Sequence, residues 1–334
     1  MDCNPSISIC IPTYNNAAYL KESLCSLVPQ VKPYDIPIYV SDNASTDDTI
    51  KILSSFRHLY SHIYFRSNSE NLGVDQNIIN AVKMASSRYV WPMGARRKFA
   101  TNCVKRVYSI ISKNNPDLLL LPMDPPTRLP KRAMLVKNRR YKSAREVFLE
   151  HTVPASALGY GILPLKAFSQ EILQNYHGKY WIILTVIFEH LASLNSVDVV
   201  FSGWPSISAP ERSSPTWVPN WFQVWNELKN AIRALPPSYS NHDKELVIRK
   251  HAQYYLSIHN LVNLRSEHVF NLNIYNECRE DLSNYTNSSL SIAKMISLLP
   301  IPNPRPLPIV RRTCAKIVRT LVQVKSPRDS ASSR

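Results

Sequence analysis

The feature that most constrains the fold of this chain is an alternation of strand-like and helix-like segments over about its first 125 residues. Four short apolar runs have the length of buried strands, at residues 6–11, 36–40, 63–66 and 89–93. Amphipathic stretches separate them, and the first carries one apolar side made of Tyr19, Leu20, Leu24 and Leu27. Strands that alternate with helices of about ten to fifteen residues are typical of βαβ units. The sequence therefore predicts an α/β fold with a mostly parallel, Rossmann-like sheet.

Signals for helix ends and for later helices complete this outline. Ser45 and Asp48 stand in the spacing of a capping box, which predicts that the second helix begins there. Further helices are predicted over residues 75–85, 179–194, 220–235 and 243–264, and again near residue 290. The last three would form a helical appendage, in which Trp217, Trp221, Phe222 and Trp225 are interpreted as packing residues.

The charge of the chain favours an anionic partner. The 334 residues include 40 Lys and Arg against 24 Asp and Glu, which gives a formal net charge of +16. Such a charge suits a nucleotide, an acidic lipid surface or nucleic acid, although it does not bear on the fold. Because no known nucleic-acid-binding motif is present, we expect no nucleic acid partner. The six cysteines include no Cys-x-x-Cys pair, so neither a zinc site nor a disulfide framework is predicted.

Polar and turn-forming residues gather where the predicted strands end. They are Pro12, Thr13, Tyr14 and Asn15 after the first strand, Asp42 and Asn43 after the second, and Asn71 and Gly73 after the third. Ligands of open α/β sheets bind beyond the carboxyl ends of the strands, where an acid accepts hydrogen bonds from a base or ribose. The same residues also fit simple turns, since Asp42 can form an Asx turn and Gly73 can reverse the chain. Both interpretations remain open.

These motifs carry a resemblance to a known family. Residues 8–15 read Ser-Ile-Cys-Ile-Pro-Thr-Tyr-Asn, residues 40–49 read Val-Ser-Asp-Asn-Ala-Ser-Thr-Asp-Asp-Thr, and residues 71–73 read Asn-Leu-Gly. In this order and spacing they resemble the family 2 glycosyltransferases, which have the GT-A fold. The second segment is similar to that of bacterial O-antigen sugar transferases, abequosyltransferase-like enzymes in particular. The resemblance covers residues 5–125 well and the remainder only in general layout.

The resemblance implies a site and an activity. The eight residues at the strand ends would line the pocket for a nucleotide-diphosphate sugar donor. The sugar would pass to a lipid-linked or polysaccharide acceptor in O-antigen, lipopolysaccharide or other cell-surface polysaccharide synthesis. In the family, the loop after the fourth strand reads Gly-Asp-Asp-Asp or similar, and its carboxylates hold Mg²⁺ or Mn²⁺ on the donor diphosphate.

This chain departs from the family at that loop. Ala95, Arg96 and Arg97 stand where the aspartates would be, so we expect no metal cofactor there. In one explanation, Arg96 and Arg97 belong to the nucleotide site and supply positive charge to the diphosphate directly. In another, the chain is a catalytically inactive pseudo-glycosyltransferase that binds a nucleotide, a glycan or a partner. In the third, the arginines are solvated loop charges.

The acceptor side is expected over residues 146–205. The resemblance implies an acidic catalytic base near the start of the helix predicted over 179–194, but no Glu-Asp pair is present there. His177 and Glu189 are the candidates for this base, and His177 also fits a helix cap or a surface position. Residues 127–145 hold eight Lys and Arg and no acid, a density that fits either a solvated loop or a surface facing an anionic substrate.

The chain is expected to divide into three parts. These are a GT-A domain at 1–205, with a nucleotide-binding half at 1–125 and an acceptor half at 126–205, the helical appendage at 206–300, and a basic tail at 301–334. In the tail, one apolar helix stripe is formed by Val310, Cys314, Ile317, Leu321 and Val324. A basic amphipathic helix favours an anionic membrane surface, and docking on the protein body is the alternative.

The expected location follows from these parts. No apolar run approaches the roughly 20 residues that span a bilayer, and the first residues lack the pattern of a signal peptide. We therefore expect a cytoplasmic protein that is peripheral at the inner face of the cell membrane.

Overall fold

The computed structural model describes residues 6–124, 138–155, 157–175, 180–204, 207–208 and 218–300. The chain forms two compact units, one from Met1–Ser213 and Glu227–Val247, the other from Ser214–Asn226 and Ile248–Arg334. The boundaries at residues 205 and 300 expected from the sequence stay predictions. The basic tail at 301–334 lies outside the described residues.

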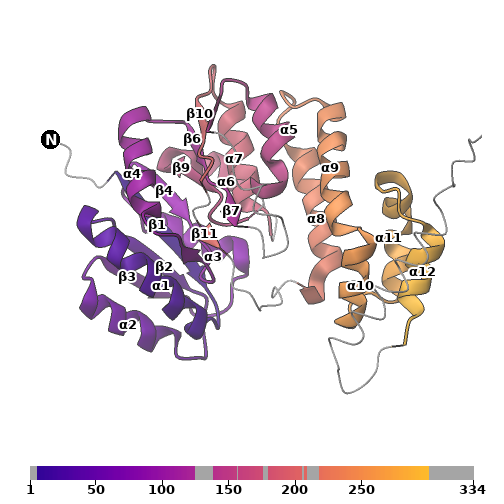
Figure 1. The fold of residues 1–334 in the computed structure, drawn as a ribbon, viewed down its shortest axis with the longest axis horizontal. Coiled ribbons are helices and arrows are strands. Elements are labelled where there is room, and N and C mark those ends of the chain that lie inside the picture. The colour runs from indigo at the N-terminus through magenta and orange to yellow at the C-terminus, as the bar shows by residue number, and fades with distance from the viewer. Residues whose placement is uncertain are drawn as a thin grey trace, which may run out of the picture. The chain divides into compact units, whose positions relative to one another are not determined.

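Within the described residues, eight strands of the first unit form one sheet in the order β3-β2-β1-β4-β9-β6-β10-β8 (Figure 1). Strand β9 runs antiparallel to both of its neighbours and β8 runs antiparallel to β10, whereas the other neighbouring strands are parallel. The predicted α/β fold with a mostly parallel sheet is therefore confirmed. The strands are β1 (Ile7–Thr13), β2 (Ile38–Asp42), β3 (Ile63–Ser67), β4 (Tyr89–Pro92), β6 (Leu118–Leu120), β8 (Arg139–Tyr141), β9 (Gly161–Pro164) and β10 (Val199–Phe201).

A small second sheet has the order β5-β11-β7 in the described part of the chain. Its strands are β5 (Lys98–Phe99), β7 (Met123–Asp124) and β11 (Ile207–Ser208). Strand β5 directly follows the loop that holds Arg96 and Arg97, so this sheet fixes the far end of that loop.

Helices pack on both faces of the large sheet, and both faces of β1 are therefore buried. The described helices that precede β10 in the chain are α1 (Ala17–Val31), η1 (Lys32–Tyr34), α2 (Thr49–Leu59), α3 (Val74–Lys83), α4 (Cys103–Asn114), α5 (Ala144–Ala155), η3 (Leu165–Phe168), α6 (Gln170–Asn175) and α7 (Ile182–Ala192). Ile9 and Ile11 pack in one apolar cluster with Leu20 of α1, whereas Cys10 packs in another with Val82 of α3. This alternation along β1 places α1 and α3 on opposite faces.

The remaining helices are η4 (Val218–Asn220), α8 (Trp221–Ala234), α9 (Asn241–Tyr255), α10 (Ile258–Ser266), α11 (Leu272–Tyr285) and α12 (Leu290–Leu298). Trp221 and Trp225 are fully buried in the second unit, and Trp225 Nε1 donates to Asp281 Oδ2 at 2.7 Å, so these two act as the packing residues that the sequence predicted. Trp217 lies outside the described residues. Among the described helices, none combines the length and the apolar composition that crossing a bilayer requires.

Two predicted helix boundaries are wrong. Helix α2 begins at Thr49 and uses no capping box, because Ser45 Oγ accepts the N–H of Asn15 instead and Asp48 pairs with Lys51. The helix predicted over 243–264 is two helices, since Ser257 Oγ accepts the N–H of Asn260 at 3.1 Å and starts α10. Both differences arise from side-chain hydrogen bonds that hydrophobic periodicity does not report.

Candidate functional site

The carboxyl ends of β1 and β2 bring predicted nucleotide-binding residues to one edge of the sheet. Thr13 is the register partner of Asp42, and the N–H of Asn43 donates to Thr13 O at 2.9 Å. Pro12 is buried within β1, whereas Tyr14 is 40% exposed just beyond it. The hydroxyl of Thr13 is buried and has no hydrogen-bond partner among the described residues. This edge therefore holds a polar group that the fold leaves unsatisfied.

Asn15 and Asp47 tie the loops after β1 and β2 to each other. Asn15 Oδ1 accepts the N–H of Thr46 at 2.8 Å, and Asp47 Oδ2 accepts the N–H of Ala17 at 2.9 Å. Asp47 also accepts from Thr49; burial raises its pKa, but these hydrogen bonds outweigh that effect and hold the pKa below its ordinary value. The φ of 47° at Asn15 lies in the left-handed region, which asparagine tolerates better than most residues. These contacts fix the shape of the edge.

Asp42 forms the Asx turn that was one of the two interpretations of the sequence, and its carboxylate can still accept further hydrogen bonds. Its two carboxylate oxygens each lie 3.3 Å from the N–H of Ser45, and the residue is only 1% exposed. Among the described residues, no other group donates to this carboxylate. A carboxylate can accept about four hydrogen bonds, so Asp42 can form a turn and receive donors from a ligand at the same time.

Asn43, by contrast, is fully used by the fold. Its Oδ1 accepts from Leu72 N and Asn68 Nδ2, each at 2.9 Å, and its Nδ2 donates to Asn71 Oδ1 at 2.6 Å and Gly73 O at 3.2 Å. The side chains of Asn43 and Asn71 therefore hold the loop before α3. Gly73 has a φ of 83°, and a β-carbon there would meet nothing within 4 Å, so its backbone conformation and not crowding requires glycine.

The two arginines after β4 lie in different environments. Arg96 donates from Nε to Asn16 Oδ1 at 2.6 Å, and its guanidinium lies over the ring of Tyr19. Arg97 is half-buried beside Gly94, where a β-carbon would lie 3.7 Å from its Nε. Burial lowers the pKa of Arg97, and no described residue offers it a hydrogen bond or an ion pair. The structure argues against solvated loop charges and shows that Arg97 is a cation without a counter-ion in the described part of the chain.

A divalent metal ion does not fit the residues at this loop. Mg²⁺ and Mn²⁺ are held by oxygen ligands, whereas Ala95 has no side-chain donor atom and is only 5% exposed. Guanidinium groups carry N–H donors and no lone pair for a metal. Among the described residues, no three His, Cys, Asp or Glu side chains gather as a metal site would require.

A buried carboxylate that sequence reasoning missed stands at the start of α7. Asp75 Oδ2 accepts the N–H groups of Trp181 and Ile182 at 3.0 and 3.1 Å, although Asp75 belongs to α3. Its Oδ1 is buried without a partner among the described residues. Burial raises the pKa of Asp75 to about 7, against the lowering effect of the two N–H groups, and Glu227 adds to the rise. In the sequence, Asp75 stands out only as an acid in the first turn of a predicted helix. That position gives no indication of a contact with the start of α7.

The two predicted catalytic bases are not brought to the sheet edge by any described contact. His177 lies outside the described residues. Glu189 lies seven residues beyond Ile182, about 10 Å along the axis of α7, and its charge acts on Tyr239 and Lys244. The role of either residue as a base stays a prediction.

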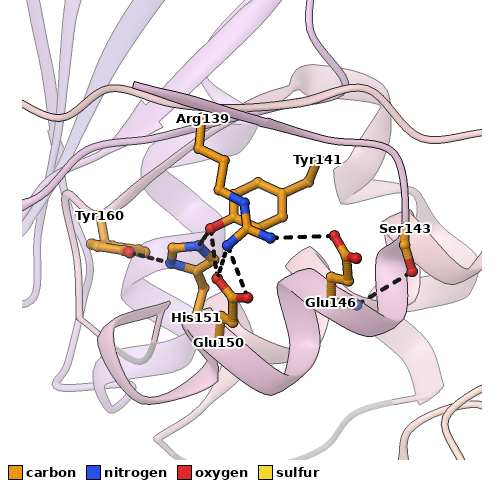
Figure 2. A network of polar contacts seen from close by, with 7 residues as sticks. All are labelled: Arg139, Tyr141, Ser143, Glu146, Glu150, His151 and Tyr160. Carbon is orange, nitrogen blue, oxygen red and sulfur yellow. Dashed lines mark hydrogen bonds and ion pairs between the residues drawn. The ribbon is translucent and has the colours of Figure 1, made fainter. Parts of the chain in front are cut away.

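A buried polar chain organises the expected acceptor half (Figure 2). His151 of α5 lies between two tyrosines, with Nδ1 2.7 Å from Tyr160 Oη and Nε2 2.7 Å from Tyr141 Oη. Because Tyr141 donates its proton to Glu150, its oxygen accepts from His151 Nε2, which leaves Nδ1 to accept from Tyr160. Burial lowers the pKa of His151 to about 4, so the ring is neutral at pH 7.

The described part of the basic stretch at 127–145 is paired with acids and does not face solvent unpaired. Its ion pairs are Arg139 with Glu150, Arg140 and Lys142 with Asp198, and Arg145 with Asp243. The other four cations of the stretch lie outside the described residues.

Fold and site together define a class: an α/β protein with the GT-A fold and incompletely hydrogen-bonded polar groups at the carboxyl ends of its first strands. The chain belongs to glycosyltransferase family 2, because the model of that family, described as glycosyl transferase family 2, matches residues 8–176, half of the chain.

Relatives of known name match shorter segments. The abequosyltransferase RfbV of Salmonella typhimurium is 46% identical over 91 residues, which are 27% of this chain and 27% of the relative. A poly(ribitol-phosphate) beta-glucosyltransferase of Bacillus spizizenii is 30% identical over 118 residues, 34% of this chain and 18% of the relative. The matches thus span only 27% and 18% of the length of these two relatives.

Solved structures share the fold over most of the chain. Staphylococcus aureus TarS 1-349 in complex with UDP has a TM-score of 0.56 at 16% identity and covers 98% of this chain and 94% of its own. The mannosyltransferase PcManGT from Pyrobaculum calidifontis, in complex with GDP-Man and Mn²⁺, has a TM-score of 0.50 at 16% identity, with 97% and 89% covered. At these identities the likeness concerns the fold alone.

Proposed function

We propose that this chain transfers a sugar from a nucleotide-diphosphate sugar to a saccharide acceptor in the synthesis of a cell-surface polysaccharide. Family membership supports the reaction class. The names of the relatives, an abequosyltransferase and a poly(ribitol-phosphate) glucosyltransferase, support an acceptor in surface polysaccharides. The structures with UDP and with GDP-Man support a nucleotide donor.

The observation that carries the proposal is the half-buried Arg97, which has no counter-ion among the described residues. A desolvated guanidinium gains most from a ligand with clustered negative charge, and its planar set of donors matches phosphate oxygens. Arg97 therefore binds the donor diphosphate. Arg96, which is held by Asn16, keeps the loop in place beside it.

Asp42 and Thr13 bind the nucleoside part of the donor. The Asp42 carboxylate accepts hydrogen bonds from the base or the ribose, as acids at strand ends of α/β sheets do. The buried Thr13 hydroxyl, which has no partner among the described residues, completes the polar lining. Asn43, Asn71 and Gly73 shape the pocket wall, because their hydrogen-bonding groups are engaged with one another.

The transfer step forms one bond and breaks one. The acceptor hydroxyl oxygen attacks the anomeric carbon, the bond from that carbon to the diphosphate oxygen breaks, and the hydroxyl proton passes to a base. The nucleoside diphosphate leaves with its developing charge stabilised by Arg97. Asp75 is a positioning residue in this scheme, since it holds the start of the acceptor-side helix α7 and touches backbone groups only.

The acceptor is proposed to be a lipid-linked saccharide at the anionic inner face of the membrane. Residues 305–334 contain eight basic residues and one acid, and an apolar stripe repeats along them. Such a segment binds anionic lipid through charge and apolar burial together.

Donor turnover tests the proposal. Hydrolysis or transfer is measured across a panel of nucleotide sugars, in Mn²⁺ and in EDTA. We expect slow turnover of at least one donor at the same rate in both conditions, because a guanidinium replaces charge but adds no Lewis acid. Absence of binding and turnover with every donor would exclude the function, and fast, EDTA-sensitive turnover would place metal ligands elsewhere in the chain.

A further inference from the structure

A groove lies on the part of the sheet that α3 does not cover. Helix α3 packs on β1, β2 and β4, and β3 is the edge strand, so the α3-side face of β3 stays open. An open cavity of ≈ 710 Å³ follows this edge and is lined by β2, β3, the C-terminal half of α3 and one residue of α2. We define the basic groove by six lining residues: Tyr39, Arg57, Tyr64, Arg66, Asn68 and Lys83.

The basic groove is positively charged without compensation. Arg57, Arg66 and Lys83 are exposed, and no Asp or Glu is among the residues that line the cavity. None of the three cations forms an ion pair with a residue that the structure describes. Cations that line a concave surface raise the local concentration of anions and favour their binding.

The same groove offers an aromatic face. Tyr39 and Tyr64 stack with ring centroids 5.3 Å apart and an interplanar angle of 22°, and Tyr64 is 42% exposed. An exposed tyrosine presents an apolar ring face with a polar hydroxyl at its end. Pyranose rings have apolar C–H faces and polar edges, so a sugar ring matches this pair of features.

We propose that the basic groove binds an anionic saccharide, one that carries phosphate, sulfate or carboxylate groups. The charge selects the anion and the stacked tyrosines select the sugar ring. A lipid surface is disfavoured because the apolar lining residues Phe65 and Met84 are half-buried in a concave wall, whereas membrane binding needs protruding apolar side chains.

The groove adjoins the proposed donor site without being part of it. Asn68 lines the groove and also donates to Asn43, which holds the wall of the nucleotide pocket. An acceptor polymer could thus lie in the groove while its end reaches the carboxyl edge of the sheet. Its assignment as the acceptor rests on the proposed function; the saccharide-binding groove itself does not.

Matched charge variants test the groove in the full chain without any donor. The probes are a fluorescent dextran sulfate oligosaccharide and a neutral dextran of equal length. Arg66→Gln/Lys83→Gln should weaken binding of the sulfated probe about tenfold, because two of the three cations of the groove are lost. The control Lys32→Gln/Lys113→Gln removes the same charge from exposed positions outside the groove and should change binding less than about twofold. The neutral dextran should bind weakly to all variants.

The contribution of the Tyr64 ring is tested separately. Tyr64→Ala should weaken binding of the sulfated saccharide but not of inorganic tripolyphosphate, whereas Tyr64→Phe should keep both. Equal losses in the two double variants, or no effect of Tyr64→Ala, would overturn the proposal, as would binding of phosphatidylglycerol vesicles through Arg66 and Lys83 in preference to the saccharide. Retained UDP binding in the groove variants separates a failure of the groove from a failure of the proposed function.

Discussion

Asp42 and Asn43 are neighbours in the chain, yet the fold uses their side chains differently. All the hydrogen-bonding groups of the Asn43 amide are engaged with the loop before α3. The buried Asp42 carboxylate has one donor, and Arg97 has no partner among the described residues. Asp42 and Arg97 are therefore the better candidates for ligand binding, because burying a polar or charged group is unfavourable unless a ligand supplies its missing partners.

Replacement of Asp42 by alanine tests its part in nucleotide binding. Asp42→Ala should weaken the binding of a nucleoside diphosphate by about 1 to 3 kcal/mol, the usual effect of stranding a buried hydrogen-bonding partner. Calorimetry measures the affinity, and Asp48→Ala serves as a control because Asp48 is exposed and contacts Lys51. An unchanged affinity in a folded Asp42→Ala protein would remove Asp42 from the site.

The pKa of Asp75 predicts an unusual dependence of stability on pH. A folded pKa of about 7, above the ordinary value of 3.8, means that the folded state binds this proton more tightly than the unfolded state. Its contribution to stability is complete below about pH 4 and is lost as the pH rises through 7. Relative to Asp75→Asn, the wild type should lose on the order of 3 kcal/mol between pH 5 and 8, measured by urea unfolding. Parallel pH profiles in the two proteins would show that burial does not shift this group.

Among the elements, the loop before α3 depends on the Asn43 side chain. Asn43→Ala removes the acceptor of the Leu72 N–H and the donor to Gly73 O. We expect a loss of about 1 to 3 kcal/mol in stability and faster amide exchange at Leu72. Asn114→Ala is the matched control, since that side chain is exposed and bonds only within its own helix. Equal exchange rates at Leu72 in the wild type and Asn43→Ala would contradict this role.

The first four strands and three helices could be predicted because their signals are local. Apolar periodicity placed β1 to β4 within two residues of their observed ends. Ser45 was misassigned to a capping box of α2 because its hydroxyl accepts the N–H of Asn15, 30 residues away in the loop after β1. The contact of Asp75 with the start of α7 joins residues 106 positions apart, and no pattern around Asp75 indicates it.

The proposed site could be predicted from the sequence only in part. Asp42 and Arg97 could be selected because a strand end and a broken acidic motif are visible in the sequence. The difference between these two residues and Asn43 or Asn71 could not be predicted, because it depends on which side chains already have hydrogen-bond partners in the folded loops. The basic groove was equally hidden, since its cations come from three separate elements.

For the whole molecule, the net charge of +16 is distributed in parts with different roles. Ion pairs occupy the described cations of the 127–145 stretch, so we expect anionic partners to bind at the basic groove and at the basic tail instead. The full chain should co-sediment with anionic vesicles at physiological salt, and deletion of residues 305–334 should release it while its circular dichroism is retained. Each basic residue near an anionic leaflet contributes about 1 kcal/mol, so the loss should be nearly complete. Full-length protein that stays in the supernatant would assign the tail to another role.

Calorimetry in EDTA can decide whether Arg97 binds a donor diphosphate without a metal ion. Uridine and guanosine diphosphates are compared with their monophosphates, in the wild type, Arg97→Lys and Arg97→Gln. We expect the wild type to prefer the diphosphate of its base by about tenfold or more, Arg97→Gln to lose most of this preference, and Arg97→Lys to keep part of it. A preference that survives in Arg97→Gln, or one that develops only when Mg²⁺ or Mn²⁺ is added, would contradict this expectation.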